Sequence, residues 1–314
     1  MKLRTFAAAI TVNLAGITAA IALDQSLPPY QVVPAVSGQL KSVGSDTLNI
    51  EMTGWAKAFK DLYPKVTIEI EGKGSATAPP ALLEGASQFG PMSRPMTAEE
   101  VEAFEKKYGY KATGFRVAVD ALAVYVSKNN PIQCLTLPQL NRIFSSTYKV
   151  AGAGNIKTWE EVGLTGEWAT TPISLYGRNS ISGTYEFFRE IALNNGDYKD
   201  EVKQQPGSEA VVRAVAGDRS AIGYSGIGYK TNDVRTVPLS AYNGGKCYDP
   251  SEEATFSGNY PIARYLYIYL NKSRVSNSTR CAASSSNISY QRTARRKPKW
   301  LGLTQSPMQF EKRT

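Results

Sequence analysis

Apolar and polar positions along the chain follow two periods, one typical of buried strands and one typical of amphipathic helices. Short apolar or alternating runs predict strands at residues 40–43, 66–70, 89–92, 115–119, 121–126, 173–176, 221–224 and 262–270. Apolar residues spaced three and four apart predict helices at residues 47–62, 75–85, 97–108, 138–144, 187–193 and 208–216. This alternation of strand and helix predicts an α/β fold with largely parallel pairing.

The length of 314 residues favours two lobes over one compact domain. Lobe one is predicted to combine residues 37–119 with residues 225–271, and lobe two to hold residues 120–224. The apolar run that passes through Asp120 is long enough to cross from one lobe to the other. Two crossing strands would form a hinge, so that the lobes close over a ligand in the cleft between them.

The N-terminus has the pattern of a secretory signal peptide. Lys2 and Arg4 precede an apolar run from Phe6 to Leu23, and small residues near Ala22 suit a cleavage site. The run is too weakly apolar for a membrane anchor. Residues 1–22 are therefore predicted to be removed on export, which would leave a soluble protein in the periplasm.

The net charge of +9 comes from the C-terminal tail, residues 272–314, which hold ten Lys and Arg and one acid. Because these bases lie in a Ser-rich segment without a helix or strand period, they do not indicate a nucleic-acid-binding domain. Two interpretations of the tail remain open. It is a disordered basic extension, or it is an out-of-frame translation of a final helix, which we favour because the chain otherwise ends on a buried strand.

The cysteine and histidine content limits the disulfides, catalytic sites and metal sites that the chain can form. Of the three cysteines, Cys134 and Cys247 are the preferred disulfide pair, because Cys281 lies in the unusual tail, although unpaired cysteines remain an alternative. The sequence has no histidine. This removes Ser-His-Asp and Cys-His catalysis and argues against a zinc site, so we expect no metal and no cofactor.

Three turns share one design, in which a strand ends, a Gly, Ser and Thr-rich turn follows, and a helix begins. They contain Ser45, Asp46 and Thr47, then Ser75, and then Ser182, Gly183 and Thr184. The start of a helix offers unpaired N–H groups and positive dipole ends, and hydroxyls add rotatable donors. One such turn alone is an ordinary helix cap. Three that converge would form a cage of neutral donors around an oxyanion.

Two arginines lie on strand-end turns. Arg178, four residues before Ser182, has a planar fork that can bind two oxygens of an oxyanion, although a surface ion pair is the simpler alternative. Arg94 lies in the turn after residues 89–92, either at the mouth of the cleft or merely as a support for its turn.

The segment 177–185, Gly-Arg-Asn-Ser-Ile-Ser-Gly-Thr-Tyr, is the most specific motif of the chain. With it, the chain resembles the phosphate-binding component of bacterial phosphate ABC importers, a type II periplasmic binding protein, from about residue 37 to residue 271. In that family an arginine followed four positions later by Ser-Gly-Thr binds phosphate. The resemblance therefore implies ligand roles for Arg178, Ser182, Gly183 and Thr184, and corresponding roles for Thr47 and Ser75.

The sequence departs from the family at two carboxylates. Many members have an aspartate where this chain has Ser93, and another family aspartate falls on Ser180. A phosphate that keeps a proton needs an acceptor, which sulfate does not. Asp46, in the first turn, is the candidate substitute, with a simple helix cap as the alternative. Ser93 itself remains in the predicted phosphate site.

The resemblance implies a monomeric, exported binding protein that captures inorganic phosphate and docks on an ABC-type membrane permease. It implies no enzymatic activity. A phosphatase-like hydrolase with a Ser or Thr nucleophile is the alternative from another class, but it would need a base that no motif identifies. A basic-tailed surface adhesin is a third possibility. Within the binder class, sulfate and molybdate remain open as ligands.

Overall fold

The structure is a computed structural model, and it describes residues 30–149 and 154–271. The predicted signal peptide, the C-terminal tail and Cys281 lie outside the described residues. Within the described ranges, no helix has both the length and the apolar character needed to span a membrane.

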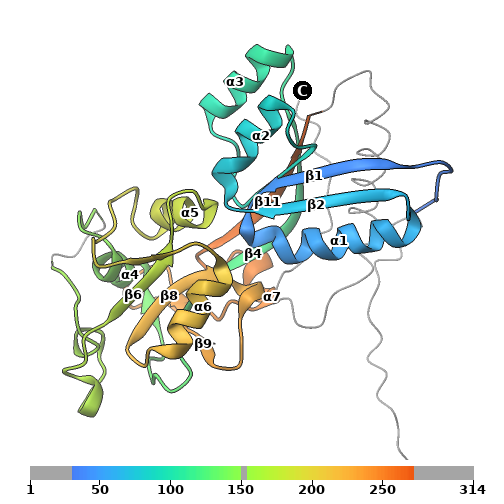
Figure 1. Cartoon of the computed structure of the whole chain (residues 1–314). Helices are drawn as coiled ribbons and strands as arrows, with labels where there is room; N and C mark the ends of the chain where they lie inside the picture. The colour runs from blue at the N-terminus through green and yellow to red at the C-terminus, as the bar shows by residue number, and fades with distance from the viewer. Residues whose placement is uncertain (1–29, 150–153, 272–314) are drawn as a thin grey trace, which may run out of the picture.

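Lobe one is a twisted sheet with helices on both faces (Figure 1). Its strands lie in the order β2 (Val66–Gly72), β1 (Gly38–Gly44), β3 (Phe89–Met92), β11 (Ala263–Leu270) and the first half of β4 (Thr113–Ser127). Its helices are α1 (Asn49–Leu62), α2 (Ala78–Glu84) and α3 (Ala98–Tyr108). Met52 and Phe59 of α1 belong to one core cluster, and Leu82 of α2 and Phe104 of α3 to another. The lobe therefore has two apolar cores, one on each face of its sheet.

Lobe two continues the same sheet from the second half of β4. The order there is β4, β8 (Ala221–Gly226), β6 (Ser174–Arg178) and β7 (Lys203–Gln205), while β9 (Val234–Thr236) also pairs with β4, and β5 (Leu135–Thr136) pairs with β10 (Leu239–Ser240). The helices are α4 (Leu137–Phe144), α5 (Gly183–Ile191), α6 (Ser208–Gly217) and α7 (Glu252–Phe256). Short 3-10 turns are η1 (Asp46–Leu48) and η2 (Ser75–Thr77) in lobe one, and η3 (Glu160–Val162), η4 (Gly166–Trp168) and η5 (Ile227–Tyr229) in lobe two. One contiguous core, from Ala121 to Ile262, fills this lobe.

Two strands cross between the lobes. The sequence predicted separate strands at residues 115–119 and 121–126, but the structure has the single strand β4, which runs straight through Asp120. The second crossing strand is β11, which pairs antiparallel with β4 so that Arg264 lies opposite Asp120. Pairing away from these two strands is parallel, as at β1 with β2 and β6 with β8. The fold is thus a mixed sheet of two parallel halves joined by an antiparallel pair.

The return from lobe two differs from the sequence prediction. Residues 225–262 were predicted to lie in lobe one, yet Ile227, Val237 and Tyr260 belong to the core of lobe two. Strand β9 also pairs with the second half of β4. We therefore propose that the chain re-enters lobe one at Ala263, where β11 begins, because the apolar side chains of the preceding segment are buried against lobe two.

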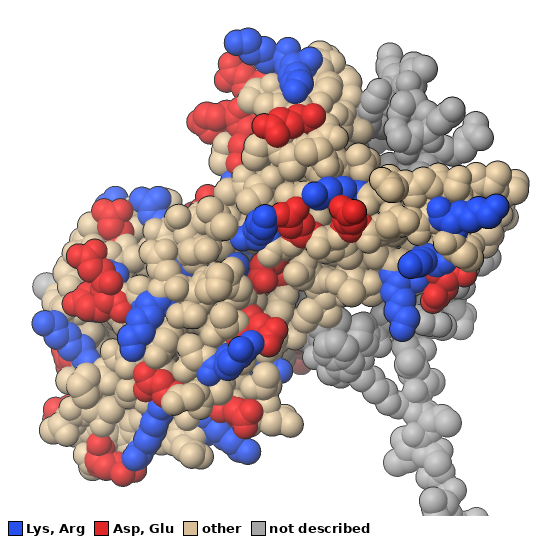
Figure 2. Space-filling view, in the orientation of Figure 1, with Lys and Arg blue, Asp and Glu red and all other residues tan. Residues whose placement is uncertain are grey.

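Charged side chains of both signs lie on the face of the molecule seen in Figure 2. Figure 2 shows Lys and Arg interspersed with Asp and Glu over both lobes on the face in view. Ion pairs account for part of this pattern, such as Lys41 with Glu71 at 3.4 Å and Arg213 with Glu209 at 2.7 Å.

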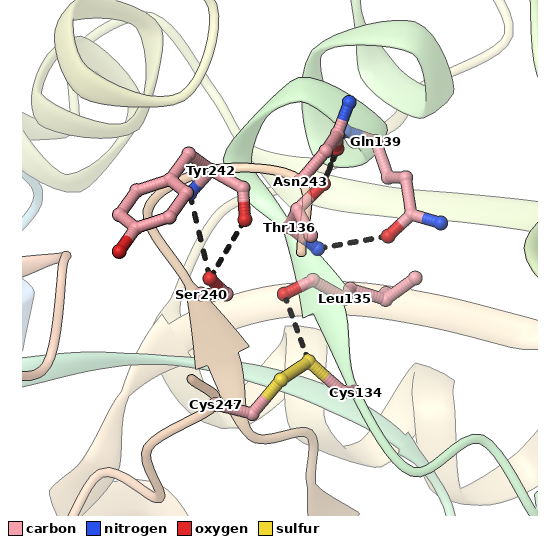
Figure 3. Close-up of a disulfide and its surroundings, with 8 residues drawn as sticks. All are labelled: Cys134, Leu135, Thr136, Gln139, Ser240, Tyr242, Asn243 and Cys247. Carbon is pink, nitrogen blue, oxygen red and sulfur yellow. Dashed lines mark hydrogen bonds between the residues drawn. A yellow bond between two sulfur atoms is a disulfide. The ribbon is translucent and has the colours of Figure 1, made fainter. Parts of the chain in front are cut away.

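A disulfide confirms the predicted pairing of Cys134 with Cys247, whose Cα atoms lie 6.1 Å apart (Figure 3). It joins residues 113 positions apart in the sequence. The surrounding bonds run along β5 and β10, where Thr136 donates to Asn243 at 2.7 Å and Ser240 donates to the Tyr242 carbonyl at 2.8 Å. The disulfide therefore links the segment around Cys247, which precedes α7, to the start of β5 in lobe two.

Candidate anion-binding site between the lobes

The first predicted turn follows β1 and is held by the neighbouring strand β3. The Ser45 N–H donates to the Pro91 carbonyl at 2.7 Å, and the Gly74 N–H donates to the Gly44 carbonyl at 2.8 Å. A Cβ at Gly44 would lie 2.1 Å from the Pro91 carbonyl oxygen, so only glycine allows this approach. The turn buries Thr47 at the interface between the lobes.

The second turn brings Ser75 and Ser93 together. Gly74 has a φ of +145°, which L side chains rarely adopt, and it turns the chain from β2 into η2. The Ser75 hydroxyl accepts from the Ser93 N–H at 2.9 Å and lies 3.1 Å from the Ser93 hydroxyl. Both serines are buried. Ser93, included in the predicted site despite replacing a family aspartate, thus lies beside Ser75.

The third turn begins α5 in lobe two. Ser182 is its N-cap, and the Ser182 hydroxyl accepts from the Thr184 N–H at 3.1 Å. Gly183 follows, and a Cβ there would lie 2.5 Å from the Ser75 hydroxyl and 2.8 Å from the Ser93 hydroxyl. Glycine at this position therefore lets the start of α5 touch both serines of lobe one.

The three turns meet across the boundary between the lobes. The hydroxyl oxygens of Thr47 and Thr184 lie 3.0 Å apart, and the Ala76 N–H donates to the Ile181 carbonyl at 3.1 Å. We refer below to the hydroxyl-bearing residues Thr47, Ser75, Ser93 and Thr184, together with Gly183, which packs against two of them, as the hydroxyl cluster. The convergence that the sequence suggested is present, with donors from both lobes and in a closed arrangement.

Arg178 is fully buried at the end of β6, where it contacts Asp46, the chain neighbour of Thr47. Its Nη1 donates to Asp46 Oδ2 at 3.1 Å and to the Ser208 hydroxyl at 2.9 Å, and its Nη2 donates to the Pro206 carbonyl at 3.2 Å. Its Nε has no hydrogen-bond partner among the described residues. Burial lowers the pKa of the guanidinium, and the negative charge of Asp46 opposes that shift.

Asp46 links the first turn to lobe two. Its Oδ2 accepts from the Ser208 N–H at 2.8 Å as well as from Arg178, and its carbonyl accepts from the Tyr229 hydroxyl at 2.6 Å. The sequence proposed either a phosphate contact or a helix cap for this residue. In the structure its carboxylate forms an ion pair across the lobes, and it lies at the start of α6, which the sequence alone did not indicate.

Sequence reasoning missed a second buried ion pair, Arg264 with Asp120. The Arg264 Nη2 lies 2.9 Å from Asp120 Oδ2 and donates to the Thr184 hydroxyl at 2.7 Å, while its Nη1 donates to the Gly183 carbonyl at 3.2 Å. Burial raises the pKa of Asp120, and the Arg264 charge and the Ile227 N–H lower it. The available signal was a single carboxylate inside an apolar strand, which we interpreted only as a crossing point.

Another buried carboxylate lies one helical turn beyond Thr47. Both carboxylate oxygens of Glu51 are buried without a hydrogen-bond partner among the described residues. Burial raises the pKa of Glu51 to about 8, and the charge of Asp120 adds to the shift. The residue is therefore mostly protonated in the folded protein at neutral pH, because the backbone hydrogen bond that favours the charged form does not offset the cost of burial.

Arg94 contacts both lobes at the edge of the site. It binds Glu100 of α3 through two bonds of 2.7 Å, and its Nε forms an ion pair with Glu186 of α5. This position agrees with the idea that Arg94 lies where the lobes meet. No group of three or more possible metal-ligating side chains occurs among the described residues.

The comparisons with known proteins first define the superfamily and the fold of this chain. The PBP superfamily domain matches residues 31–280. A solved phosphate ABC transporter substrate-binding protein from Clostridium perfringens, with bound phosphate, aligns with a TM-score of 0.65 and 27% identity over 79% of this chain and 92% of its own. An ABC-type phosphate transport receptor from Vibrio cholerae shares the fold, with a TM-score of 0.61 and 20% identity over 82% of this chain and 95% of its own.

The particular family follows from a curated relative, the phosphate-binding protein PstS of Pseudomonas aeruginosa. It is 51% identical over 275 residues, which are 87% of this chain and 85% of the relative. The chain belongs to the PstS family within the PBP superfamily. The predicted resemblance and the two-lobed type II fold are confirmed.

Proposed function

We propose that this chain captures inorganic phosphate between its lobes and delivers it to an ABC-type membrane permease. The observation that carries the proposal is the meeting of the lobes at their hydroxyls, where Thr47 of lobe one lies 3.0 Å from Thr184 of lobe two, and Gly183 of lobe two packs against Ser75 and Ser93 of lobe one. The function of the relatives, a phosphate-binding protein and a substrate-binding protein with bound phosphate, supports it.

The chemistry of the cluster suits a small dianion. Hydroxyl protons can rotate from a neighbouring hydroxyl to an anion, so each Ser or Thr becomes a donor without moving its backbone. Arg178 adds a buried positive charge, and its Nε is available because it has no partner among the described residues. The start of α5, which Ser182 caps, contributes the positive end of the helix dipole beside Gly183.

Closure of the lobes would complete the site. Neither lobe alone holds all the donors, because Thr47 and Ser75 come from lobe one and Arg178 and Thr184 from lobe two. A phosphate that contacts both sets stabilises the closed form over the open one, and the permease would recognise that closed form. The crossing strands β4 and β11 are the elements about which the lobes would move.

Several finer points belong to the same proposal. The signal peptide exports the chain to the periplasm, where the disulfide is stable, and the mature protein acts as a monomer without a cofactor. The relatives are named as binding proteins of transport systems rather than as enzymes, in agreement with the predicted absence of catalysis. Nucleic acid is not a partner, because the excess positive charge lies in the tail.

Calorimetry on the exported, mature chain tests the proposal. Titration with phosphate should give one site with a much lower Kd than titration with sulfate or molybdate. Tighter binding of sulfate or molybdate would reassign the ligand within the same class of protein. Absence of binding to all three oxyanions would overturn the proposal, and sustained hydrolysis of a chromogenic phosphate ester would replace it with the hydrolase alternative.

A further inference from the structure

Arg264 is a buried arginine at the beginning of β11, one of the two strands that cross between the lobes (Figure 1). It lies opposite Asp120 of β4, the other crossing strand. The Arg264 Nε and Nη2 donate to Asp120 Oδ2 at 3.2 and 2.9 Å. The Asp120 carboxylate therefore fixes the guanidinium relative to both crossing strands and balances its charge.

The same guanidinium also reaches the start of α5 in lobe two. Its Nη1 donates to the Gly183 carbonyl at 3.2 Å, and its Nη2 donates to the Thr184 hydroxyl at 2.7 Å. The guanidinium carbon lies 5.3 Å from the centre of the Phe187 ring, one helical turn beyond Gly183. Arg264 therefore connects the crossing strands to two residues of the hydroxyl cluster, although it is 80 positions from Thr184 in the sequence.

The contact with Arg264 restricts the direction of the Thr184 hydroxyl proton. A guanidinium has only donors and stays protonated in proteins, so the Thr184 oxygen must accept from it. The single proton of the Thr184 hydroxyl then points away from Arg264 and is left to be donated elsewhere. The hydroxyl oxygen of Thr47 lies 3.0 Å from the same Thr184 oxygen. Thr184 is thus held as a donor at the place where the two lobes meet.

Arg264 differs from Arg178 in what its donors are free to do. All three nitrogens of Arg264 already donate to protein groups. The Arg178 Nε, in contrast, has no hydrogen-bond partner among the described residues. Arg178 is therefore suited to bind an anion directly, whereas Arg264 is suited to act on the anion through Thr184.

We propose that Arg264 is a positioning residue of the phosphate site, which holds the start of α5 against the crossing strands and orients Thr184 as a donor to the anion. The inference rests on the proposed function. A donor that is oriented before the anion arrives loses less conformational freedom on binding than a freely rotating hydroxyl, so the affinity is higher. Because Arg264 belongs to β11, its contacts also link the hydroxyl cluster to the strands about which the lobes would move.

The test is a double-mutant cycle of phosphate titrations by calorimetry, on the mature wild-type chain, Arg264→Lys, Thr184→Val and the two combined. Lysine keeps the charge beside Asp120 but lacks the planar fork that also reaches the start of α5. Each single variant should weaken phosphate binding about 10-fold or more. In the Thr184→Val background, Arg264→Lys should weaken it by only about 3-fold or less, because the hydroxyl that Arg264 orients is absent.

A purely structural role of Arg264 gives a different result in the same cycle. Equal weakening by Arg264→Lys with and without the Thr184 hydroxyl would overturn the assignment, as would a wild-type affinity in Arg264→Lys. Arg116→Lys is the matched control, since Arg116 is an exposed arginine of β4 that lies over the Tyr265 ring, and it should leave the Kd unaltered. Failure of the wild-type chain to bind phosphate would instead overturn the proposed function, so the two failures are distinguishable.

A second variant covers the case in which Arg264→Lys does not fold. Arg264→Gln combined with Asp120→Asn removes both charges of the buried pair, so neither group is left as an unpaired charge. Urea unfolding without phosphate shows whether this variant is folded. It should then bind phosphate about 10-fold more weakly than the wild type, and the loss should again shrink in a Thr184→Val background. Wild-type affinity in the folded variant overturns the assignment.

Discussion

Thr47 and Thr184 come from opposite lobes and are 137 positions apart in the sequence, yet their hydroxyl oxygens lie 3.0 Å from each other. Each stands near the start of a helical segment that follows a strand, η1 after β1 and α5 after β6. Each hydroxyl therefore lies near the positive end of a helix dipole. An anion bound beside them would be stabilised by helix starts from both lobes, so closure and anion binding should be coupled.

Arg178→Ala should weaken phosphate binding roughly 100-fold or more, because the buried positive charge is lost and the anion stays desolvated. Calorimetry measures the change. Arg213→Ala is the matched control, since Arg213 pairs with Glu209 on the exposed surface of α6 and should leave the Kd unaltered. An Arg178→Ala variant that binds phosphate as tightly as the wild type would remove this residue from the site.

Gly183→Ala should weaken phosphate binding by roughly 10- to 100-fold without a comparable loss of stability in the absence of ligand. In this structure the added Cβ would lie 2.5 Å from the Ser75 hydroxyl of the other lobe, so we expect the substitution to oppose closure. Gly217→Ala, where nothing lies within 4 Å, controls for the substitution itself. Equal phosphate affinities for the two variants would mean that the start of α5 does not need to approach Ser75.

Glu51→Gln should make stability less dependent on pH. The pKa of Glu51 is about 8 in the folded protein against 4.5 for an ordinary glutamate, so the folded state holds a proton that the unfolded state releases. Stability from this source is complete below pH 4.5 and falls as the pH rises toward 8, by up to about 1.4 kcal/mol per unit. Urea unfolding can be measured at about pH 5.5, roughly one unit above the ordinary glutamate pKa, and at about pH 8, the pKa of Glu51 in the folded protein. The difference in the free energy of unfolding between these two pH values should be smaller for the variant than for the wild type.

Cys134→Ser combined with Cys247→Ser should lower stability by roughly 2–5 kcal/mol, because the bridge closes a long loop within lobe two. Thermal melts with and without reductant measure the effect, and reductant should shift the wild type but not the double variant. Cys281→Ser serves as control and should leave both melts unchanged. If the melting temperature of the wild type does not change under conditions that reduce the bridge, the disulfide contributes little to stability.

Local sequence patterns predicted much of the fold and the three turns. Ser75, Ser182 and Thr184 lie where a strand gives way to a helix, and that pattern is visible within about ten neighbouring residues. The capping box of Thr97 with Glu100 is equally local, and the structure has both of its bonds. Features of this kind depend on the backbone close by, so the sequence contains the information they require.

Long-range pairs could not be predicted in the same way. Asp120 and Arg264 are 144 positions apart, and each resembles an ordinary strand residue until β4 and β11 are paired. The return to lobe one was expected near residue 225, because β9 and β10 are only three and two residues long and leave no periodic signal. The later return proposed here rests on the burial of Ile227 and Val237 in the core cluster of lobe two, which depends on the whole fold.

The central claim is that residues of both lobes hold one phosphate ion at the hydroxyl cluster. A crystal structure of the mature chain with phosphate tests it most directly. The account predicts one tetrahedral anion within hydrogen-bond distance of Thr47, Ser75, Arg178 and Thr184, with both lobes in contact with it. A phosphate bound to one lobe alone, or bound away from Arg178, would contradict the account.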